Sequence, residues 1–247
     1  MNLLLVEPSE LAADGTCALA AADRRTEHVR RVLGAGVGAT LKAGIVGGPL
    51  GTAEVIADAP SGALMLRVVT SAPAPPPLAV ELVLAIPRPK VIARAIETCA
   101  AFAVRRVALT NAWRVDKSYL RSPKLAAAAL AQAARLGAEQ GATTHVPPID
   151  VHERLMGLLD ARFAAPDPGE LRLLAHPGAP PIERALAGRA PLPCALAIGP
   201  EGGWIARELD TLEARGFIAC SLGAPILRVE SAIAAALGQL LLLDRLR

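Results

Sequence analysis

A pair of Gly/Pro turns near the C-terminal end constrains this chain more than any other feature of its sequence. The apolar run 194–198 leads into Gly-Pro-Glu-Gly-Gly at 199–203, and the run 217–222 leads into Gly-Ala-Pro at 223–225. Short apolar runs that end at such turns are typical of buried strands, and a helical pattern follows each turn. We therefore expect two consecutive strand–turn–helix units.

Both turns are suited to hold a ligand against the backbone. Pro200 fixes φ at an early turn position, while Gly202 and Gly203 can adopt positive φ and leave room for close approach. Ligands of open α/β sheets bind beyond the carboxyl ends of the strands, where these turns would lie. One such turn alone is more often an ordinary connection, whereas two side by side predict a site for a flat, uncharged ring such as adenine.

The two segments also carry a specific resemblance. Ile-Gly-Pro-Glu-Gly-Gly-Trp at 198–204, followed by Leu-Gly-Ala-Pro-Ile-Leu-Arg-Val-Glu-Ser-Ala at 222–232, resembles the paired signature of the RsmE family. Members of that family are SPOUT-superfamily methyltransferases that modify N3 of a uridine in 16S ribosomal RNA. The resemblance implies a deep trefoil knot formed by these segments, with S-adenosylmethionine bound inside it. It is strong over 194–235 and fades towards both ends of the chain.

The chemistry of methyl transfer to N3 of a uridine suggests roles for individual residues of the signature. Arg228 is the expected catalytic cation, because a fixed positive charge near the uridine oxygens would stabilise the N3 anion. Glu230 is the second catalytic candidate, as a proton acceptor, although a carboxylate in the first turn of a helix also has a structural role. The expected cofactor contacts, largely through the backbone, are Ile198, Gly199, Pro200, Glu201, Gly202, Gly203, Leu222, Gly223, Ile226, Leu227 and Arg228.

Composition narrows the classes of partner and site. Aromatic residues make up only 2% of the chain, which argues against a platform of aromatic rings for stacked bases, while a net charge of +3 permits an anionic partner. The cysteines contain no C-x-x-C pair and the four histidines lie far apart, so we expect no zinc or other metal site and no disulfide framework. The cysteines, which we expect to be packing residues, are Cys17, Cys99, Cys194 and Cys220.

Two apolar stretches bear on location. The run from Met1 to Glu7 lacks the basic residues of a signal peptide, and the run from Ala232 to Leu243 is about half the length of a membrane span. The expected protein is cytoplasmic, with no membrane partner.

Residues 1–70 have the texture of a small β-barrel, because short β-type runs alternate with Gly and Pro. A helical stretch near 23–33 includes His28, and together with Gly38 and Leu41 it resembles the start of the family's PUA-like RNA-binding barrel, although Gly34 and Ala39 stand where the family has Arg and Asp. Its basic residues can bind RNA phosphates or form a solvated helix face, and we weigh the two equally. These residues are Arg24, Arg25, Arg30 and Arg31.

The Pro-rich run 71–77 reads as a semi-rigid spacer. We therefore expect a PUA-like barrel domain at 1–72, a linker at 73–77 and a methyltransferase domain at 78–247. Alternating strand and helix patterns after residue 78 predict a parallel sheet with helices on both faces, so the expected fold class is α/β, of the SPOUT type with a C-terminal knot. The expected strands include 78–86, 106–110, 143–146 and 171–176, and the expected helices include 90–103, 122–140, 150–162 with Asp150 as N-cap, and 182–188.

A basic and aromatic stretch at 113–119 follows a predicted strand end. Arg114 and Lys117, interleaved with aromatic side chains, can hold a splayed nucleotide by charge and stacking, although a solvated loop is the alternative. Arg114 also matches an arginine of the family, whereas Thr143 and Pro225 replace two others. The chain thus resembles a divergent member, and the nucleotide it modifies is left open.

The leading hypothesis is methylation of N3 of a uridine in the 16S ribosomal RNA of the small subunit, by a homodimer that associates through the apolar last helix. One alternative is a SPOUT methyltransferase that acts on another RNA position, which the replaced arginines favour. The other is an RNA- or ribosome-binding protein without turnover. The retained turns count against this second alternative, because a binding protein does not need a methyl-donor pocket.

Overall fold

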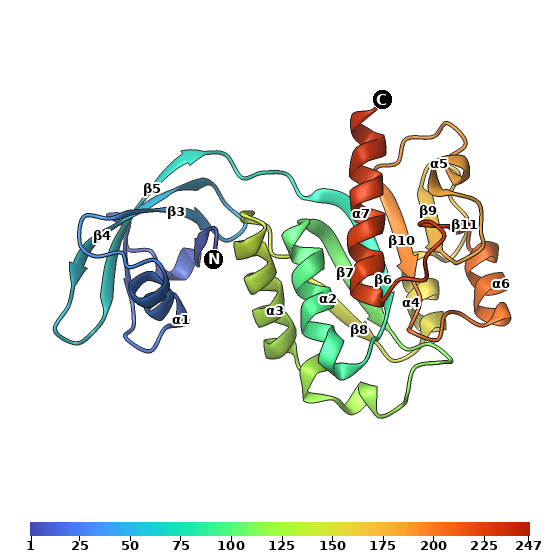
Figure 1. Cartoon of the computed structure of the whole chain (residues 1–247), viewed down its shortest axis with the longest axis horizontal. Helices are drawn as coiled ribbons and strands as arrows, with labels where there is room; N and C mark the ends of the chain where they lie inside the picture. Colours follow the sequence, from blue (N-terminus) through green and yellow to red (C-terminus); the bar gives the residue numbers. More distant parts are fainter. The chain divides into compact units, whose positions relative to one another are not determined.

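The computed structural model describes residues 1–247, which divide into two compact units (Figure 1). Unit 1 comprises residues 1–77 and 135–146, and unit 2 comprises residues 78–134 and 147–247. Residues 135–146 were expected in the second domain, at 78–247, but they belong to unit 1. The reason is apolar packing, since Ala138 joins Leu3 and Leu5 in one buried cluster of unit 1.

Unit 1 is built on a five-stranded sheet in the order β1-β3-β4-β5-β2. β1 and β3 pair in parallel, and the other neighbours pair antiparallel. Alternate side chains of these strands, such as Leu4, Val6, Val55 and Leu66, form the buried core, as the period of two in a half-buried strand requires. The strands are β1 (Leu4–Val6), β2 (Thr16–Leu19), β3 (Thr40–Ile45), β4 (Leu50–Asp58) and β5 (Leu64–Ala72).

The helical part of unit 1 is short. Asp23 caps the predicted helix, because its carboxylate accepts a hydrogen bond from the backbone N–H of Arg25 at 2.8 Å. The elements are a 3₁₀ turn η1 (Pro8–Glu10), α1 (Arg24–Glu27) and a π-helical turn η2 (His28–Val32). Residues 135–140, the last part of α3 (Ala127–Gln140), also belong to unit 1.

Unit 2 contains the predicted parallel sheet, in the order β11-β9-β10-β6-β7-β8. All neighbouring strands in it run parallel. Every residue of β10 is buried, which explains why this segment is an unbroken apolar run. The strands are β6 (Leu78–Ala85), β7 (Val104–Thr110), β8 (Ile149–His152), β9 (Leu171–Ala175), β10 (Cys194–Ile198) and β11 (Ile218–Cys220).

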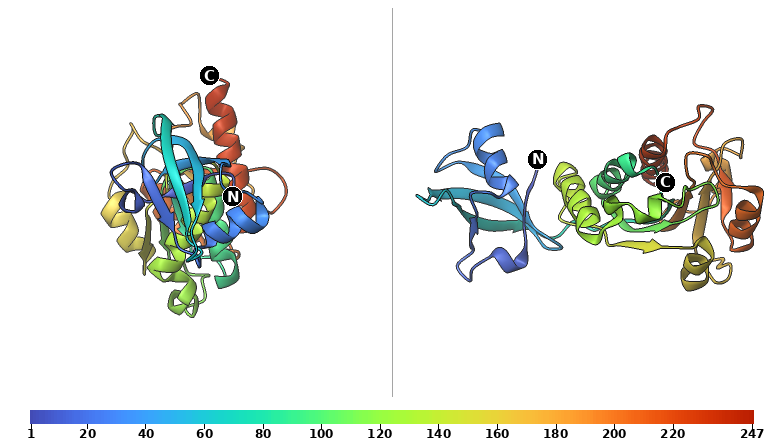
Figure 2. Two further views of the ribbon diagram at one scale, coloured as in Figure 1. Left: turned by 90° about the vertical axis from the view of Figure 1, so that its left-hand side faces the viewer. Right: turned by 90° about the horizontal axis from the view of Figure 1, so that it is seen from below.

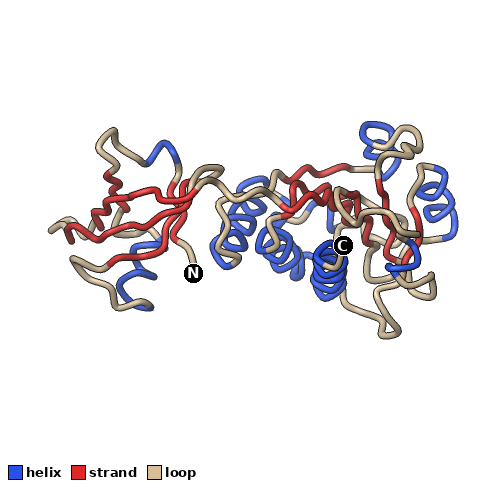
Figure 3. The backbone as a smooth tube through the Cα atoms, turned by 90° about the horizontal axis from the view of Figure 1, so that it is seen from above, coloured by secondary structure: helices blue, strands red, loops and turns tan.

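Helices cover both faces of this sheet, as predicted. Figure 2 shows α2 and α7 over one face, while α4 lies on the other, and Figure 3 shows helices along both sides of the strands. α7 also packs against α2 and β10. None of the helices combines the length and the apolar character needed to span a membrane. The helices are α2 (Pro89–Ala101), α3 (Ala127–Gln140), α4 (Leu155–Arg162), α5 (Ile182–Ala185), α6 (Ala206–Ala214) and α7 (Val229–Arg245), with 3₁₀ turns η3 (Tyr119–Arg121) and η4 (Pro123–Leu125) before α3.

Two predicted elements are wrong. Residues 143–146 form no strand, because they pack in unit 1, where Thr144 Oγ1 donates to the carbonyl of Gly48 at 2.7 Å. The strand lies instead at β8, so Asp150 is paired with Ala108 of β7 and does not cap a helix. The Asp150 carboxylate forms an ion pair with Arg162, and α4 begins only at Leu155.

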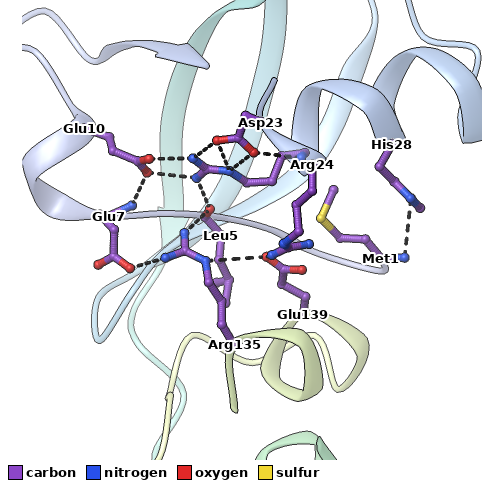
Figure 4. Close-up of polar contacts among 10 residues, drawn as sticks. Met1, Leu5, Glu7, Glu10, Asp23, Arg24, His28, Arg135 and Glu139 are labelled. Atoms are coloured by element: carbon purple, nitrogen blue, oxygen red, sulfur yellow. Dashed lines mark hydrogen bonds and ion pairs between the residues drawn. The ribbon is translucent and has the colours of Figure 1, made fainter. Parts of the chain in front are cut away.

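A network of ionised side chains joins the segments of unit 1 (Figure 4). Arg25, only 5% exposed, forms ion pairs with Glu10 and Asp23 and donates to the carbonyl of Leu5 at 2.8 Å. Arg135 of α3 donates to the same Leu5 carbonyl and forms an ion pair with Glu7. The carbonyl oxygen of Leu5 in β1 therefore accepts hydrogen bonds from two guanidinium groups, one on α1 and one on α3.

The network corrects part of the RNA-binding expectation. Arg25 is buried and fully partnered, so it cannot present its charge to a phosphate. Arg24 forms an ion pair with Glu139, and Arg30 forms one with Asp58. Of the four predicted arginines, Arg31 presents the most exposed side chain, and its only ion pair is an i,i+4 contact on the helix surface.

The network also sets a direction for pH dependence. Hydrogen bonds from Arg25 outweigh burial and hold the pKa of Glu10 below its ordinary value of 4.5. Burial opposes ionisation of Asp23, but hydrogen bonds and the charge of Arg25 keep its pKa below its ordinary value of 3.8. A carboxyl with a lowered pKa stabilises the fold above its unfolded pKa and loses that contribution as the pH falls through its folded pKa. The stability of unit 1 should therefore decline below about pH 4.

We expect Arg25→Met to lower the free energy of unfolding of unit 1 by about 3 kcal/mol, because it leaves Glu10 and Asp23 without their cation. The variant should also lose most of the acid dependence, since the pKa of both carboxyls would rise. Hydrogen exchange of peptides from β3 to β5, measured at pH 7 and pH 4, reads out both effects. Arg31→Met is the matched control and should change stability by less than about 0.5 kcal/mol. An unchanged exchange rate in Arg25→Met would contradict the structural role of the network.

Candidate functional site

The two predicted turns lie together at the carboxyl edge of the sheet in unit 2, where they line a cavity of about 330 Å³. Residues 198–204 continue from β10, and residues 221–227 continue from β11. β9 lies between these strands in the sheet, so its own carboxyl end, 175–177, lines the same cavity. Parallel pairing thus brings three strand ends to one site.

The first turn depends on its two glycines for different reasons. Gly203 has a φ of +71°, and its N–H donates to the carbonyl of Pro200 at 2.7 Å, which closes the turn. Gly202 does not have positive φ, contrary to expectation. A Cβ at Gly202 would lie 3.1 Å from Cδ of Arg114, so the absent side chain makes room for Arg114 and not directly for a ligand. Arg114 also donates to the carbonyl of Gly202, which places a predicted RNA-binding residue in the wall of this cavity.

Trp204 supports the turn from behind. A Cβ at Gly199 would lie 3.0 Å from Nε1 of Trp204, so glycine allows the indole to pack against the turn. Trp204 is only 4% exposed, and its Nε1 has no hydrogen-bond partner. Trp204 belongs to the signature at 198–204, but its packing role could not be predicted from the sequence.

The second turn is held by side chains that sequence reasoning missed. Ser221 Oγ donates to the carbonyl of Gly223 at 3.1 Å and accepts from its N–H at 3.2 Å. Gln239 of α7 donates through Nε2 to the carbonyl of Leu222 at 2.9 Å. Gly223 has a φ of +130°, and Ile226, which lines the cavity, is 87% exposed. The turn is therefore fixed from outside while it offers an apolar surface to the cavity.

All the predicted cofactor contacts except Arg228 line the cavity. Arg228 is exposed, forms no ion pair and lies between two lining residues, Leu227 and Val229. Glu230 also lies outside the wall, because its carboxylate is 3.8 Å from Arg94 of α2. The geometry favours the structural alternative for Glu230.

Three ionisable side chains line the cavity: Arg114, His176 and Glu201. The Glu201 carboxylate accepts a hydrogen bond from the backbone N–H of Arg88 at 3.0 Å, so it is turned towards the start of α2. His176 follows β9, and its backbone N–H donates a hydrogen bond to the carbonyl of Cys220 at 2.9 Å. The sequence indicated no secure base and did not single out His176, because the end of β9 carries no Gly-rich turn.

The remaining predicted RNA-binding residue of unit 2, Lys117, lines a separate cavity of about 700 Å³. The cysteines are free and buried, as expected of packing residues. Burial raises the pKa of Cys99 and of Cys194 to about 12 and that of Cys220 to about 11, so these thiols are poor nucleophiles.

Residues 74–241 match a family model described as the RNA methyltransferase domain. The ribosomal RNA small subunit methyltransferase E of Treponema pallidum, a curated relative, is 28% identical to this chain over an alignment of 255 residues. The alignment covers 96% of this chain and 89% of the relative.

Solved structures show the same fold over nearly the whole chain. Ribosomal RNA small subunit methyltransferase E of Neisseria gonorrhoeae, bound to S-adenosyl methionine, has a TM-score of 0.77 at 20% identity and covers 98% of each chain. A Legionella pneumophila protein in complex with the bound cofactor SAM has a TM-score of 0.75 at 21% identity, over 97% of this chain and 96% of that one.

The two glycines of the first turn should respond differently to alanine. Gly203→Ala should cost about 1 kcal/mol through backbone strain at positive φ, whether or not Arg114 is present. Gly202→Ala should be destabilising only while Arg114 occupies the adjacent space, so Arg114→Ala should relieve it. Urea unfolding, followed by the fluorescence of buried Trp204, measures both double-mutant cycles. Relief of Gly203→Ala by Arg114→Ala would refute this assignment of roles.

Proposed function

The chain belongs to the family of RNA methyltransferase domains, as its signature predicted, and from this premise we propose that it transfers the methyl group of S-adenosylmethionine to N3 of a uridine in 16S ribosomal RNA. The observation that carries the proposal is the cavity framed by the two glycine turns. The name of the Treponema pallidum relative supports the ribosomal substrate, and the ligand of the Neisseria gonorrhoeae structure supports the methyl donor.

The cavity fits a methyl donor with an adenine ring and a polar tail. Its volume, about 330 Å³, lies in the range of small-molecule sites. Ile198, Ile226 and Leu227 supply apolar contacts, while the turns supply backbone donors and acceptors. S-adenosylmethionine, when bound, supplies the electrophilic methyl group, and these residues hold and orient it.

The nucleophile must lose a proton during the reaction. N3 of uridine forms a bond to the methyl carbon as the sulfur–carbon bond breaks, and the N3 proton passes to a base. His176 is our candidate for that base, because a neutral imidazole has one ring nitrogen that can accept a proton and because Glu201 already accepts a hydrogen bond from Arg88. Arg114 and Arg228 are candidates to stabilise the negative charge on the uridine oxygens, since an arginine stays protonated.

The finer features of the fold belong to the same proposal. We assign the SPOUT-type trefoil knot to residues 194–231, supported by the pairing of β11 with β9, which takes the chain past β9 to the edge of the sheet. Unit 1 is proposed as the PUA-like RNA-binding domain, supported by its small mixed sheet and by exposed Arg31. A cytoplasmic location follows from the ribosomal substrate.

A second candidate function is methylation of another RNA position. The observation that favours it is Pro225, which lines the cavity where the RsmE signature has an arginine. Two other family arginines are replaced at Gly34, where φ is +60°, and at Thr143, which is buried. This chain therefore lacks three arginine side chains that the RsmE pattern has, and with them any contact that they would make with RNA.

Methylation of small ribosomal subunits by the purified protein, followed by mass analysis of digested RNA, tests the position. Methyl uridine at N3 in 16S RNA is the expected product, and a methyl group elsewhere would favour the second candidate. We expect His176→Ala to lower the single-turnover rate at saturating RNA by about 10²-fold or more, because it removes the base. Its affinity for S-adenosylmethionine, measured by calorimetry, should change little. Lost donor binding with an intact rate would make His176 a ligand contact.

We further propose a homodimer that associates through α7. Leu242 and Leu246 are exposed, as are Ile226 and Leu227 in the turn that precedes the helix. Exposed apolar side chains of this kind are typical of a protein interface. Ile226 and Leu227 line the cavity, so a partner that covers them would also cover the site.

We expect Leu242→Arg to convert the dimer to a monomer, because it would bury a charge without a partner in the interface. Light scattering at micromolar concentration measures the change. Leu33→Arg, at an exposed apolar position of unit 1, is the control and should leave the dimer intact. A monomeric parent protein that is fully active would refute the dimer.

A further inference from the structure

The separate cavity of about 700 Å³ lies at the carboxyl ends of β7 and β8. Its walls are the loop after β7, the residues 153–156 after β8, and one side of α6. It does not share lining residues with the first cavity, but Arg114, which lines the first, lies in the chain between Trp113 and Val115, which line the second. The two cavities are therefore neighbours along one loop.

We propose that this second cavity binds a nucleotide of the RNA next to the one that is methylated, with the base stacked on Trp113 and the phosphates near Lys117, Arg154 and Arg207. The proposal rests on the proposed function in one respect, namely that the ligand is RNA. It assigns the methylated base and its neighbour to different cavities on either side of Arg114.

Trp113 has the properties of a stacking surface. Its side chain is 78% exposed, in a chain with only two tryptophans. The loop that carries it is fixed, because the backbone N–H of Trp113 donates to Glu208 of α6 at 2.7 Å. The same carboxylate accepts from the N–H of Ile205 at 3.1 Å. An indole held in solvent by a fixed backbone presents its face to a base at a small entropic cost.

The charges around the cavity match a phosphate backbone. Lys117, Arg154 and Arg207 line it, are exposed and form no ion pair. Other arginines of this unit are neutralised, as Arg162 is by Glu81 and Asp150. Two carboxylates, Glu153 and Glu208, also line the cavity, so the three cations are in excess. The carboxylate of Glu208 is already occupied by two backbone N–H groups. Unpaired cations around an exposed aromatic ring favour a single-stranded nucleic acid over an apolar or cationic partner.

Apolar side chains complete the wall of the cavity next to the end of β7. Asn111 also lines this part of the wall, but its Oδ1 is buried, so we assign it no contact with a base. Leu155 and Ile205 add apolar contacts to the same wall. The combination is a stacking ring, an apolar wall and cations for the phosphates.

Iodide quenching of tryptophan fluorescence tests the proposal on the full-length protein, because exposed Trp113 is accessible to iodide and Trp204 is buried. The probe is a single-stranded oligoribonucleotide that contains uridine and adenosine. We expect saturating oligonucleotide to protect Trp113 from iodide. Trp113→Ala should weaken binding of the oligonucleotide by about tenfold or more, whereas Trp113→Phe, which keeps an aromatic face, should restore most of it.

A second measurement addresses the cations. The double variant Arg154→Gln/Arg207→Gln should lower the slope of log affinity against log salt by about 2, one unit for each lost phosphate contact. Arg184→Gln is the matched control, since Arg184 is also exposed and unpaired but lines neither cavity, and it should leave the slope unchanged.

The outcomes separate this proposal from the proposed function. If Trp113 stays accessible to iodide at saturating RNA, or if Trp113→Ala binds as tightly as the parent, the second cavity is not a nucleotide site, even when methylation is intact. If RNA protects Trp113 but no methyl group reaches 16S RNA, the nucleotide site stands and the proposed function fails. Calorimetric binding of S-adenosylmethionine to each variant shows that the fold of unit 2 is kept.

Discussion

Parallel strand pairing is the constraint on which the rest of unit 2 depends. Because all six strands of the sheet run in the same direction, their carboxyl ends meet at one edge, and the loops that follow them form the two cavities. The central strand β10 is fully buried, so the register of its neighbours fixes where the first glycine turn begins. The chemistry of the site thus depends on apolar packing well below it.

Periodicity and turn residues were sufficient to predict most of this sheet. The run 194–198 and the pattern after residue 78 predicted β10, β6 and the parallel arrangement, because buried strands have a simple apolar signature. The errors fall where tertiary contacts override local preference. Asp150 is a residue type that favours helix caps, but its pairing with β7 keeps it in a strand. Residues 143–146 belong to unit 1, where Thr143 and Thr144 are buried.

The site was predictable in its backbone and less so in its side chains. The glycine turns can be predicted from their composition. His176, after β9, and Gln239, on α7, contribute to the site without any local sequence motif. Arg25 was misread because a basic residue on a short helix has the same sequence pattern whether it faces solvent or an internal pair of carboxylates. Arg114 was predicted as an RNA-binding residue away from the cofactor turns, but it lines the cavity and donates to the carbonyl of Gly202 in the first turn.

Unit 1 is built from two segments that lie far apart in the sequence, and this has a consequence for its folding during synthesis. Leu3 and Leu5 are covered by Ala138, and the carbonyl of Leu5 receives a hydrogen bond from Arg135, so the first strand depends on residues more than half-way along the chain. The N-terminal part cannot complete its core until those residues have left the ribosome, although domains generally fold as units during translation. A fragment that ends at the Pro-rich run would expose this apolar surface permanently, and it would be prone to aggregate rather than to fold as a separate RNA-binding module.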